Sequence, residues 1–197
     1  MTTTATTLEW NPLLVDQLDR HWQHQLRPRL EGMTDEEYFW EPVPGMWSVR
    51  PRGASRTAIQ GGSGALTIDF ALPEPVPPPA TTIAWRLAHV IVGCLAMRNA
   101  SHFGGPPADY ASWTYAGSAS EALGQLDEQY AAWLGGVHGL GEEGLARPCG
   151  PAEGPFADLP LAALVLHITR EVIHHGAEIS LLRDLYTHTP HPDRKDS

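Results

Sequence analysis

Three residues of metal-binding types, His89, Glu171 and His175, stand at positions from which they could bind one ion. Glu171 and His175 are four positions apart, so on a helix their side chains lie one turn apart on the same face. A carboxylate oxygen and an imidazole nitrogen placed in this way can converge on one cation. The spacing therefore indicates two of the ligands of a metal site.

A third ligand must come from another helix, because helical bundles build metal sites from side chains on facing helices. His89 is the candidate, since it is a lone histidine in the apolar run 85–92. A buried neutral imidazole needs partners for both ring nitrogens, and a metal on one and an acceptor on the other would supply them. Two histidines and one carboxylate leave coordination positions open, which is typical of catalytic metal sites.

The same residues fit two simpler interpretations. A single histidine within an apolar helix is often a core residue whose nitrogens are hydrogen-bonded, and a Glu–His pair one turn apart is often a solvated ion pair. Spacing alone leaves these interpretations open beside the metal site.

Three further polar residues near the predicted ligands are interpreted as supporting groups. His174 points about 100° away from its neighbour around the helix, and we expect it to have a structural role or to orient a ligand. His167 lies one turn before the predicted carboxylate ligand and is expected to orient it. Glu178, one turn beyond the pair, is expected to form an ion pair with Arg86 or Arg183.

Long helices must position these residues, and four segments carry the required 3.6-residue apolar spacing. They span residues 12–31, 81–102, 118–140 and 161–186. Asn11 is predicted to be the N-cap of the first, with Pro12 in its first turn. The last segment is apolar on most of its circumference, which predicts the most buried helix. With almost no strand signal elsewhere, the pattern predicts an all-α four-helix bundle.

The segment 41–79 between the first two helices is rich in proline and glycine and is longer than the roughly 2–8 residues that join bundle helices. A capping-box pattern at 34–37 precedes it and predicts a short helix, and alternation at 66–70 allows one short strand. We expect either a functional covering loop or a surface excursion. In the first case Trp47 anchors the segment and Arg50 contributes to one wall of the metal pocket.

The chain of 197 residues is predicted to hold one domain at 11–187, with flexible tails at 1–10 and 188–197. Its net charge of −10 argues against binding to nucleic acid or anionic lipid.

No apolar run approaches the roughly 20 residues that span a bilayer, and the polar N-terminus is not a secretory signal. We therefore expect a cytoplasmic protein with no membrane partner. Two cysteines are too few for a disulfide framework.

Several motifs resemble the DinB-like superfamily. They are Trp85-Arg-Leu-Ala-His89, Glu171-Val-Ile-His-His175-Gly-Ala-Glu178-Ile, Leu182-Arg-Asp-Leu-Tyr186 and, earlier, Met33-Thr-Asp-Glu-Glu with Trp40-Glu-Pro-Val-Pro and Trp47-Ser-Val. The resemblance spans roughly residues 10–187. It implies a DinB-type four-helix bundle, often a homodimer, with a divalent metal held at the open end of the bundle. The ligands in that family are commonly one histidine on helix two and a His-x-x-x-His pair on the last helix.

The sequence departs from this pattern at Glu171, which replaces the first histidine of the pair. The resulting His-Glu-His set resembles the mycothiol-dependent maleylpyruvate isomerases of the same superfamily. Carried over residue by residue, this resemblance assigns His89, Glu171 and His175 as ligands. Zn²⁺ is the expected ion, with Ni²⁺, Fe²⁺ or Mn²⁺ as alternatives. Only the metal ligands match, so the resemblance does not imply that this protein acts on the substrate of those isomerases.

The function implied is that of a metal-dependent enzyme, either a transferase or an isomerase that uses a low-molecular-weight thiol with a small-molecule substrate. The alternative is a non-catalytic stress-response protein that binds metal or a small ligand. A third interpretation is a bundle whose polar triad holds no metal and serves packing or dimerisation. The sequence presents no nucleophile or general base that separates the first two. We also expect a homodimer.

Overall fold

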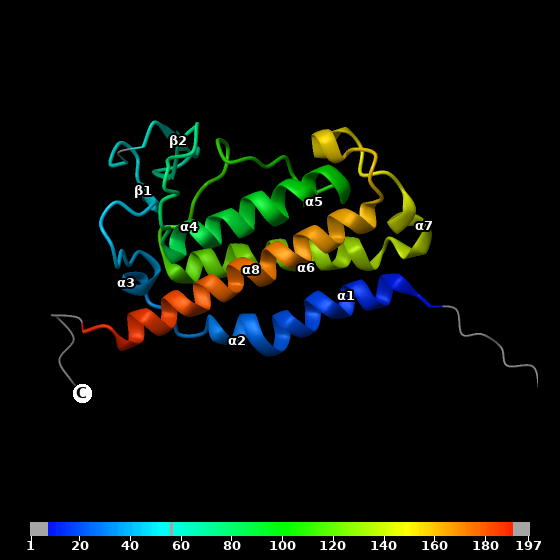
Figure 1. The fold of residues 1–197 in the computed structure, drawn as a ribbon, viewed down its shortest axis with the longest axis horizontal. Coiled ribbons are helices and arrows are strands. Elements are labelled where there is room, and N and C mark those ends of the chain that lie inside the picture. Colours follow the sequence, from blue (N-terminus) through cyan, green and yellow to red (C-terminus); the bar gives the residue numbers. More distant parts are fainter. Residues whose placement is uncertain (1–7, 56, 191–197) are drawn as a thin grey trace, which may run out of the picture.

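The computed structural model describes residues 8–55 and 57–190, and helices dominate them (Figure 1). The helical elements are α1 (Trp10–His21), η1 (Trp22–Leu26), α2 (Arg27–Arg29), α3 (Asp35–Tyr38), α4 (Ile83–Ala88), η2 (His89–Ala96), α5 (Met97–His102), α6 (Ala119–His138), α7 (Gly141–Ala146), η3 (Pro151–Phe156) and α8 (Leu161–His188). The strands are β1 (Val49–Pro51), β2 (Ile59–Gly61) and β3 (Leu66–Phe70). Most of the two predicted tails, at 1–7 and 191–197, lies outside the described residues.

Four long helical segments run side by side in Figure 1: α1–η1–α2, α4–η2–α5, α6 and α8. They match the four predicted segments, and they share one apolar core. That core includes Leu18, Trp22, Leu87, Ile91, Leu126, Trp133, Ile168 and Val172. The most buried segment is α4–η2, in which only two side chains are not fully buried, whereas α8 exposes several leucines. The expectation that the last helix is the most buried is therefore wrong.

The first helix begins earlier than predicted. Trp10 is its first residue and Glu9 its N-cap, so Asn11 is not the N-cap. Asn11 is instead buried, where its side-chain amide donates to the carbonyl of Val137 at 2.8 Å and its backbone N–H donates to Glu142 at 2.8 Å. The side chain and backbone N–H of Asn11, which we expected to cap the helix locally, are thus bonded to residues that are distant in the sequence. The short helix α3 does begin with the predicted cap, because Thr34 accepts from the backbone N–H of Glu37.

The second long segment is not a regular α-helix. From His89 to Ala96 its backbone has the wider π-helical hydrogen bonding, in which residues five apart are paired. This brings Sγ of Cys94 within 3.7 Å of Nε2 of His89. In an α-helix those two side chains would be about 140° apart around the axis. Among the described helices, none combines the length and apolar character needed to cross a bilayer.

The segment predicted as a long loop contains a three-stranded antiparallel sheet, so the predicted all-α class needs correction. The strand order is β1-β3-β2, with Val49 opposite Ile68 and Ile59 opposite Phe70. The expected strand at 66–70 is the central one. The two outer strands have three residues each, which is too short for an alternating pattern to be recognised.

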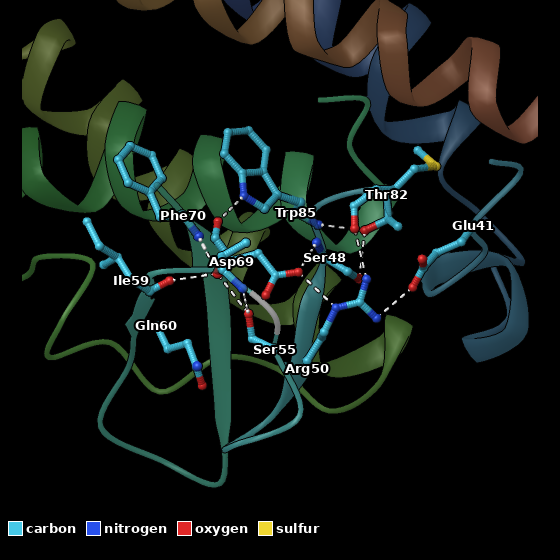
Figure 2. Close-up of polar contacts among 12 residues, drawn as sticks. Glu41, Ser48, Arg50, Ser55, Ile59, Gln60, Asp69, Phe70, Thr82 and Trp85 are labelled. Atoms are coloured by element: carbon cyan, nitrogen blue, oxygen red, sulfur yellow. Dashed lines mark hydrogen bonds and ion pairs between the residues drawn. The ribbon is translucent and has the colours of Figure 1, made fainter. Parts of the chain in front are cut away.

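Hydrogen bonds fix this sheet to the start of α4 (Figure 2). Nε1 of Trp85 donates to the backbone carbonyl of Asp69 at 2.9 Å, and the hydroxyl of Thr82 donates to that of Ser48 at 2.9 Å. The buried Asp69 carboxylate accepts from the backbone N–H of Ser48 at 2.9 Å and from Nε of Arg50 at 2.8 Å. Thr82 is also the N-cap of α4. The sheet therefore helps to set where the helix that carries His89 begins.

The structure gives Trp47 and Arg50 different surroundings, and only Trp47 has the contacts expected of its predicted role. Trp47 is buried and its ring lies 6.0 Å from that of Trp85, as expected of an anchor. Arg50 forms ion pairs with Glu41 at 2.6 Å and with Asp69 at 2.8 Å (Figure 2). Both partners lie within residues 41–79, the same segment that carries Arg50. Among the described contacts none joins Arg50 to a candidate metal ligand, so its place in the wall of a metal pocket stays a prediction.

Candidate metal centre

The structure brings the three predicted ligands together. His89 is the first residue of η2, and Glu171 and His175 lie one turn apart on α8. One donor atom from each lies within 4.8 Å of the others. Oε2 of Glu171 is 3.4 Å from Nε2 of His175, close to the roughly 3.3 Å expected between two ligands of one tetrahedral zinc with bonds of about 2.0–2.1 Å. The two imidazole rings meet edge to face, with centroids 4.7 Å apart.

Both ring nitrogens of His89 have a neighbour, the Tyr110 hydroxyl at Nδ1 and the Cys94 thiol, 3.7 Å away, at Nε2. Nδ1 lies 2.7 Å from the hydroxyl of Tyr110, and the ring stacks on Trp85 at 5.5 Å with an interplanar angle of 12°. Burial lowers the pKa of His89 to about 4, with smaller contributions from nearby His175 and Arg86. The imidazole is therefore neutral at neutral pH, which is the form that binds a metal.

Gly93 makes room for the contact between Tyr110 and His89. A Cβ at position 93 would lie 2.0 Å from the hydroxyl oxygen of Tyr110 and 3.2 Å from Nδ1 of His89. A glycine inside a helix costs about 1 kcal/mol relative to alanine, so it calls for a packing reason. Sequence reasoning missed Tyr110, because it lies in the connection after α5. Gly93, in the middle of an apolar helix, was the one signal that pointed to it.

His175 uses Nδ1 for a contact with Glu178. Oε2 of Glu178 is 2.7 Å from that nitrogen, and Nη1 of Arg86 is 3.2 Å from it. A guanidinium only donates, so Nδ1 either donates its proton to Glu178 or accepts one from Arg86. Donation to Glu178 places the proton on Nδ1 and leaves Nε2, which faces Glu171, unprotonated for a metal. Arg86 and Glu178 are themselves 3.0 Å apart, which confirms one of the two predicted pairings.

The other predicted partner of Glu178 is engaged elsewhere, since Arg183 pairs with Glu37 at 2.6 Å. Nδ1 of His167 lies 3.4 Å from Oε1 of Glu171, but it accepts a hydrogen bond from Nη2 of Arg170 at 2.6 Å and therefore does not donate to that carboxylate. His174 is largely exposed, and its Nε2 is 3.6 Å from Oε1 of Glu178.

A second group of donors, formed by His174, His175 and Glu178, also lies within 4.8 Å. The guanidinium of Arg86 is 3.0 Å from the Glu178 carboxylate in this group. A metal ion placed there would be repelled by that positive charge and would compete with the bond between Glu178 and His175. In the group of His89, Glu171 and His175, the cation near the carboxylate is Arg170, 3.5 Å from Oε1 of Glu171 on a side chain that is 70% exposed, whereas the oxygen near His175 is Oε2. This group is therefore the better candidate.

Comparison with known proteins identifies the class to which this fold and site belong. A family model described as the DinB superfamily matches residues 64–179, which is more than half of the chain and includes all three candidate ligands. The chain therefore belongs to the DinB superfamily, as the sequence motifs predicted. No curated protein and no solved structure matches the chain significantly.

Proposed function

We propose that this protein is a divalent-metal-dependent enzyme of the DinB superfamily in which His89, Glu171 and His175 hold the ion. The observation that carries the proposal is the convergence of three donor atoms from two helices within 4.8 Å. Nδ1 of His89 contacts Tyr110 and Nδ1 of His175 contacts Glu178, which leaves the Nε2 atom of each ring as the nitrogen that would bind the ion. In this proposal the four long helical segments form the DinB-type four-helix bundle.

The donor set suits a borderline transition metal. Two imidazoles and one carboxylate favour Zn²⁺, and they also accommodate Ni²⁺, Fe²⁺ or Mn²⁺. A bound cation with three protein ligands keeps positions open and supplies Lewis acidity toward a carbonyl, a water or a thiol.

The residues around the ligands hold them in the form that binds. In the form that binds metal, Nδ1 of His89 donates to the Tyr110 hydroxyl and Nδ1 of His175 donates to Glu178, so both Nε2 atoms are unprotonated. Trp85 covers one face of His89 and is itself buried, so it keeps water away from that side.

A thiol that reacts at this site would come from solution. The two cysteines of the chain, Cys94 and Cys149, are buried, and burial raises the pKa of both thiols, so neither forms a thiolate readily at neutral pH, although Sγ of Cys94 lies 3.7 Å from Nε2 of His89. This supports a low-molecular-weight thiol as the co-substrate of a transferase or isomerase. The other substrate is then a small molecule that is activated by the metal.

Elemental analysis of protein purified without a His-tag tests the metal, and a thiol-consumption screen with metal-loaded and metal-free protein tests the reaction. We expect about one divalent ion per chain and thiol consumption that requires it. Purified protein that neither contains nor takes up a divalent ion would overturn the proposal. Metal without metal-dependent thiol consumption would leave a non-catalytic metal-binding protein.

We also propose a homodimer formed by helix packing with two-fold symmetry. Leu181 and Leu185 support this, because they are one turn apart on α8 and are 59% and 46% exposed. Light scattering at tens of micromolar protein should give the mass of a dimer. A Leu181→Glu variant should give the mass of a monomer, and a wild-type monomer would contradict the proposal.

A further inference from the structure

A cavity of about 640 Å³ lies next to the candidate metal centre. Three elements form it: α5, η3 and the N-terminal part of α8. In Figure 1 the η3 turn stands beside the end of α5 and above the start of α8. The volume is within the range of roughly 300–1,000 Å³ that is typical of small-molecule sites. None of the three candidate metal ligands lines it.

The cavity and the metal centre share one turn of α8. His167 and Arg170 line the cavity, and both reach Glu171. Nδ1 of His167 is 3.4 Å from Oε1 of Glu171, and Nη2 of Arg170 is 3.5 Å from the same oxygen. A molecule in the cavity would therefore be separated from the proposed metal ligand by a single layer of side chains.

The charge of the lining favours an anion. Arg98 and Arg170 contribute two guanidinium groups, and Glu153 is the only acidic residue in the lining. Glu153 pairs with Arg98 at 3.2 Å and with His102 at 2.9 Å, so the charges of Glu153 and Arg98 offset each other and Arg170 supplies the excess positive charge of the lining. Within the described residues, the buried Nε of Arg98 has no hydrogen-bond partner. The side chain of Arg170 is 70% exposed, so it can turn toward a ligand.

The remaining walls are apolar. Phe156 and Leu159 contribute from the η3 side, and Ala163 and Leu164 contribute from α8. Phe156 is 63% exposed and Leu159 is 46% exposed, so both offer apolar surface to a molecule in the cavity. Apolar walls with a few cationic groups are the composition of a site for an amphipathic small anion.

We propose that this cavity binds a small organic anion, with its carboxylate or sulfonate at Arg170 and Arg98 and its apolar body against Phe156 and Leu164. The assignment rests on the proposed function, because it names the class of substrate that is delivered to the metal centre. Binding itself needs only the cavity.

The probe is 8-anilinonaphthalene-1-sulfonate, titrated by fluorescence into the full-length protein with and without zinc. Arg170→Gln should weaken its binding by about tenfold or more, as expected for loss of a charge-assisted hydrogen bond. Arg20→Gln is the matched control, because Arg20 lies on α1 and pairs only with Asp16 at the surface. It makes the same change of charge and should leave binding unchanged. Equal affinities of the two variants would overturn the proposal.

A second variant separates this cavity from other apolar surfaces. Ala163→Phe should fill the cavity and remove binding of both the anionic probe and its neutral analogue N-phenyl-1-naphthylamine, while Arg170→Gln should affect only the anionic probe. Circular dichroism verifies that both variants are folded. Binding of the anionic probe that survives Ala163→Phe in folded protein would place it elsewhere and overturn the proposal. His89→Ala should keep probe binding and lose metal, so the two proposals can fail separately.

Discussion

The hydroxyl of Tyr110 can lie 2.7 Å from Nδ1 of His89 because residue 93, one turn beyond His89, has no side chain. The contact orients the imidazole, and when Nδ1 donates its proton to the Tyr110 hydroxyl it leaves Nε2 unprotonated for a metal. It joins the connection after α5 to the proposed metal ligand on η2, across 21 positions of the sequence.

Tyr110→Phe should weaken zinc binding by about tenfold or more, since partners that orient a ligating histidine are typically worth 10–100-fold in metal affinity. Gly93→Ala should have an effect at least as large, because the added Cβ would displace the Tyr110 hydroxyl. A competition titration against a chelator measures both affinities.

Gly135→Ala is the control for the glycine substitution. Gly135 lies within α6 and a Cβ there would meet no atom within 4 Å, so alanine should stabilise the helix by up to about 1 kcal/mol and leave zinc affinity unchanged. Wild-type zinc affinity in Gly93→Ala would refute the role assigned to Tyr110.

His89→Ala, Glu171→Ala and His175→Ala should each remove bound metal from protein purified without a His-tag. Each substitution deletes one of three converging donors, and two donors seldom hold a divalent ion against buffer. Elemental analysis gives the metal content. His174→Ala is the control and should retain the ion, because His174 belongs to the group in which Arg86 occupies the cation position. Full metal content in any two of the three ligand variants rules out the assignment.

The sheet should be coupled to the metal centre through the connection that carries Tyr110. Gly62 donates its backbone N–H to the carbonyl of Ala111 at 3.2 Å, and Ser63 donates to Trp113 at 3.0 Å. Subtilisin cleavage within residues 61–64, followed by mass spectrometry, should therefore be slow without metal and slower still with zinc bound. Equal rates with and without zinc would mean that the segment is not coupled to the site.

Gly61→Ala should raise the cleavage rate and weaken zinc binding together. A Cβ at position 61 would lie 2.6 Å from the carbonyl oxygen of Tyr110, so the strand and the connection would have to separate. Faster cleavage with an unchanged zinc affinity would show that the sheet packs on the connection without influencing His89.

The fold should lose stability as the solution becomes alkaline. Burial raises the pKa of Tyr38, and burial together with the hydrogen bond to Asp19 raises that of Tyr130. The stability that these groups contribute is fully present below their unfolded pKa of about 10 and is lost as the pH rises above it toward their folded pKa. Tyrosinate absorbance at 295 nm from these residues should appear together with loss of the helical circular dichroism signal.

Tyr38→Phe provides the comparison for this transition. The Tyr38 hydroxyl makes only a long contact, 3.5 Å from the carbonyl of Ala116, so its removal should cost little at neutral pH and should move alkaline unfolding to higher pH. Complete ionisation of the tyrosines near pH 10 in protein that stays folded would contradict the role of burial.

The candidate ligands could be predicted from the sequence because their signals are local. Glu171 and His175 are one helical turn apart, and His89 is a single imidazole in an apolar run. The partners that hold them are not local, since Tyr110 comes from a connection whose course depends on tertiary packing. The partner of Arg50 is also distant in the sequence, because Asp69 is a buried carboxylate that the sheet brings to it.

The helices were predictable from their periodicity, and the sheet was not. β3 has five residues with a recognisable alternation, whereas β1 and β2 have three residues each and include Pro51 and Gly61. Proline and glycine are breaker signals in a sequence, and they outweigh so short a strand pattern. The sheet exists because hydrogen bonds to Trp85 and Thr82 of the neighbouring helix hold it in place.

The π-helical stretch from His89 to Ala96 also changes the helical phase of the residues on its C-terminal side. An α-helix turns by about 100° per residue, and the wider π turn rotates by less, so α5 is out of phase with α4 even though the two are continuous. Arg98 consequently faces the cavity, and Asn99 faces α6, where it donates to Gln129 at 2.9 Å. The two ends of this continuous helical segment therefore serve different sites: side chains near α4 contribute to the metal centre, and side chains of α5 contribute to the cavity.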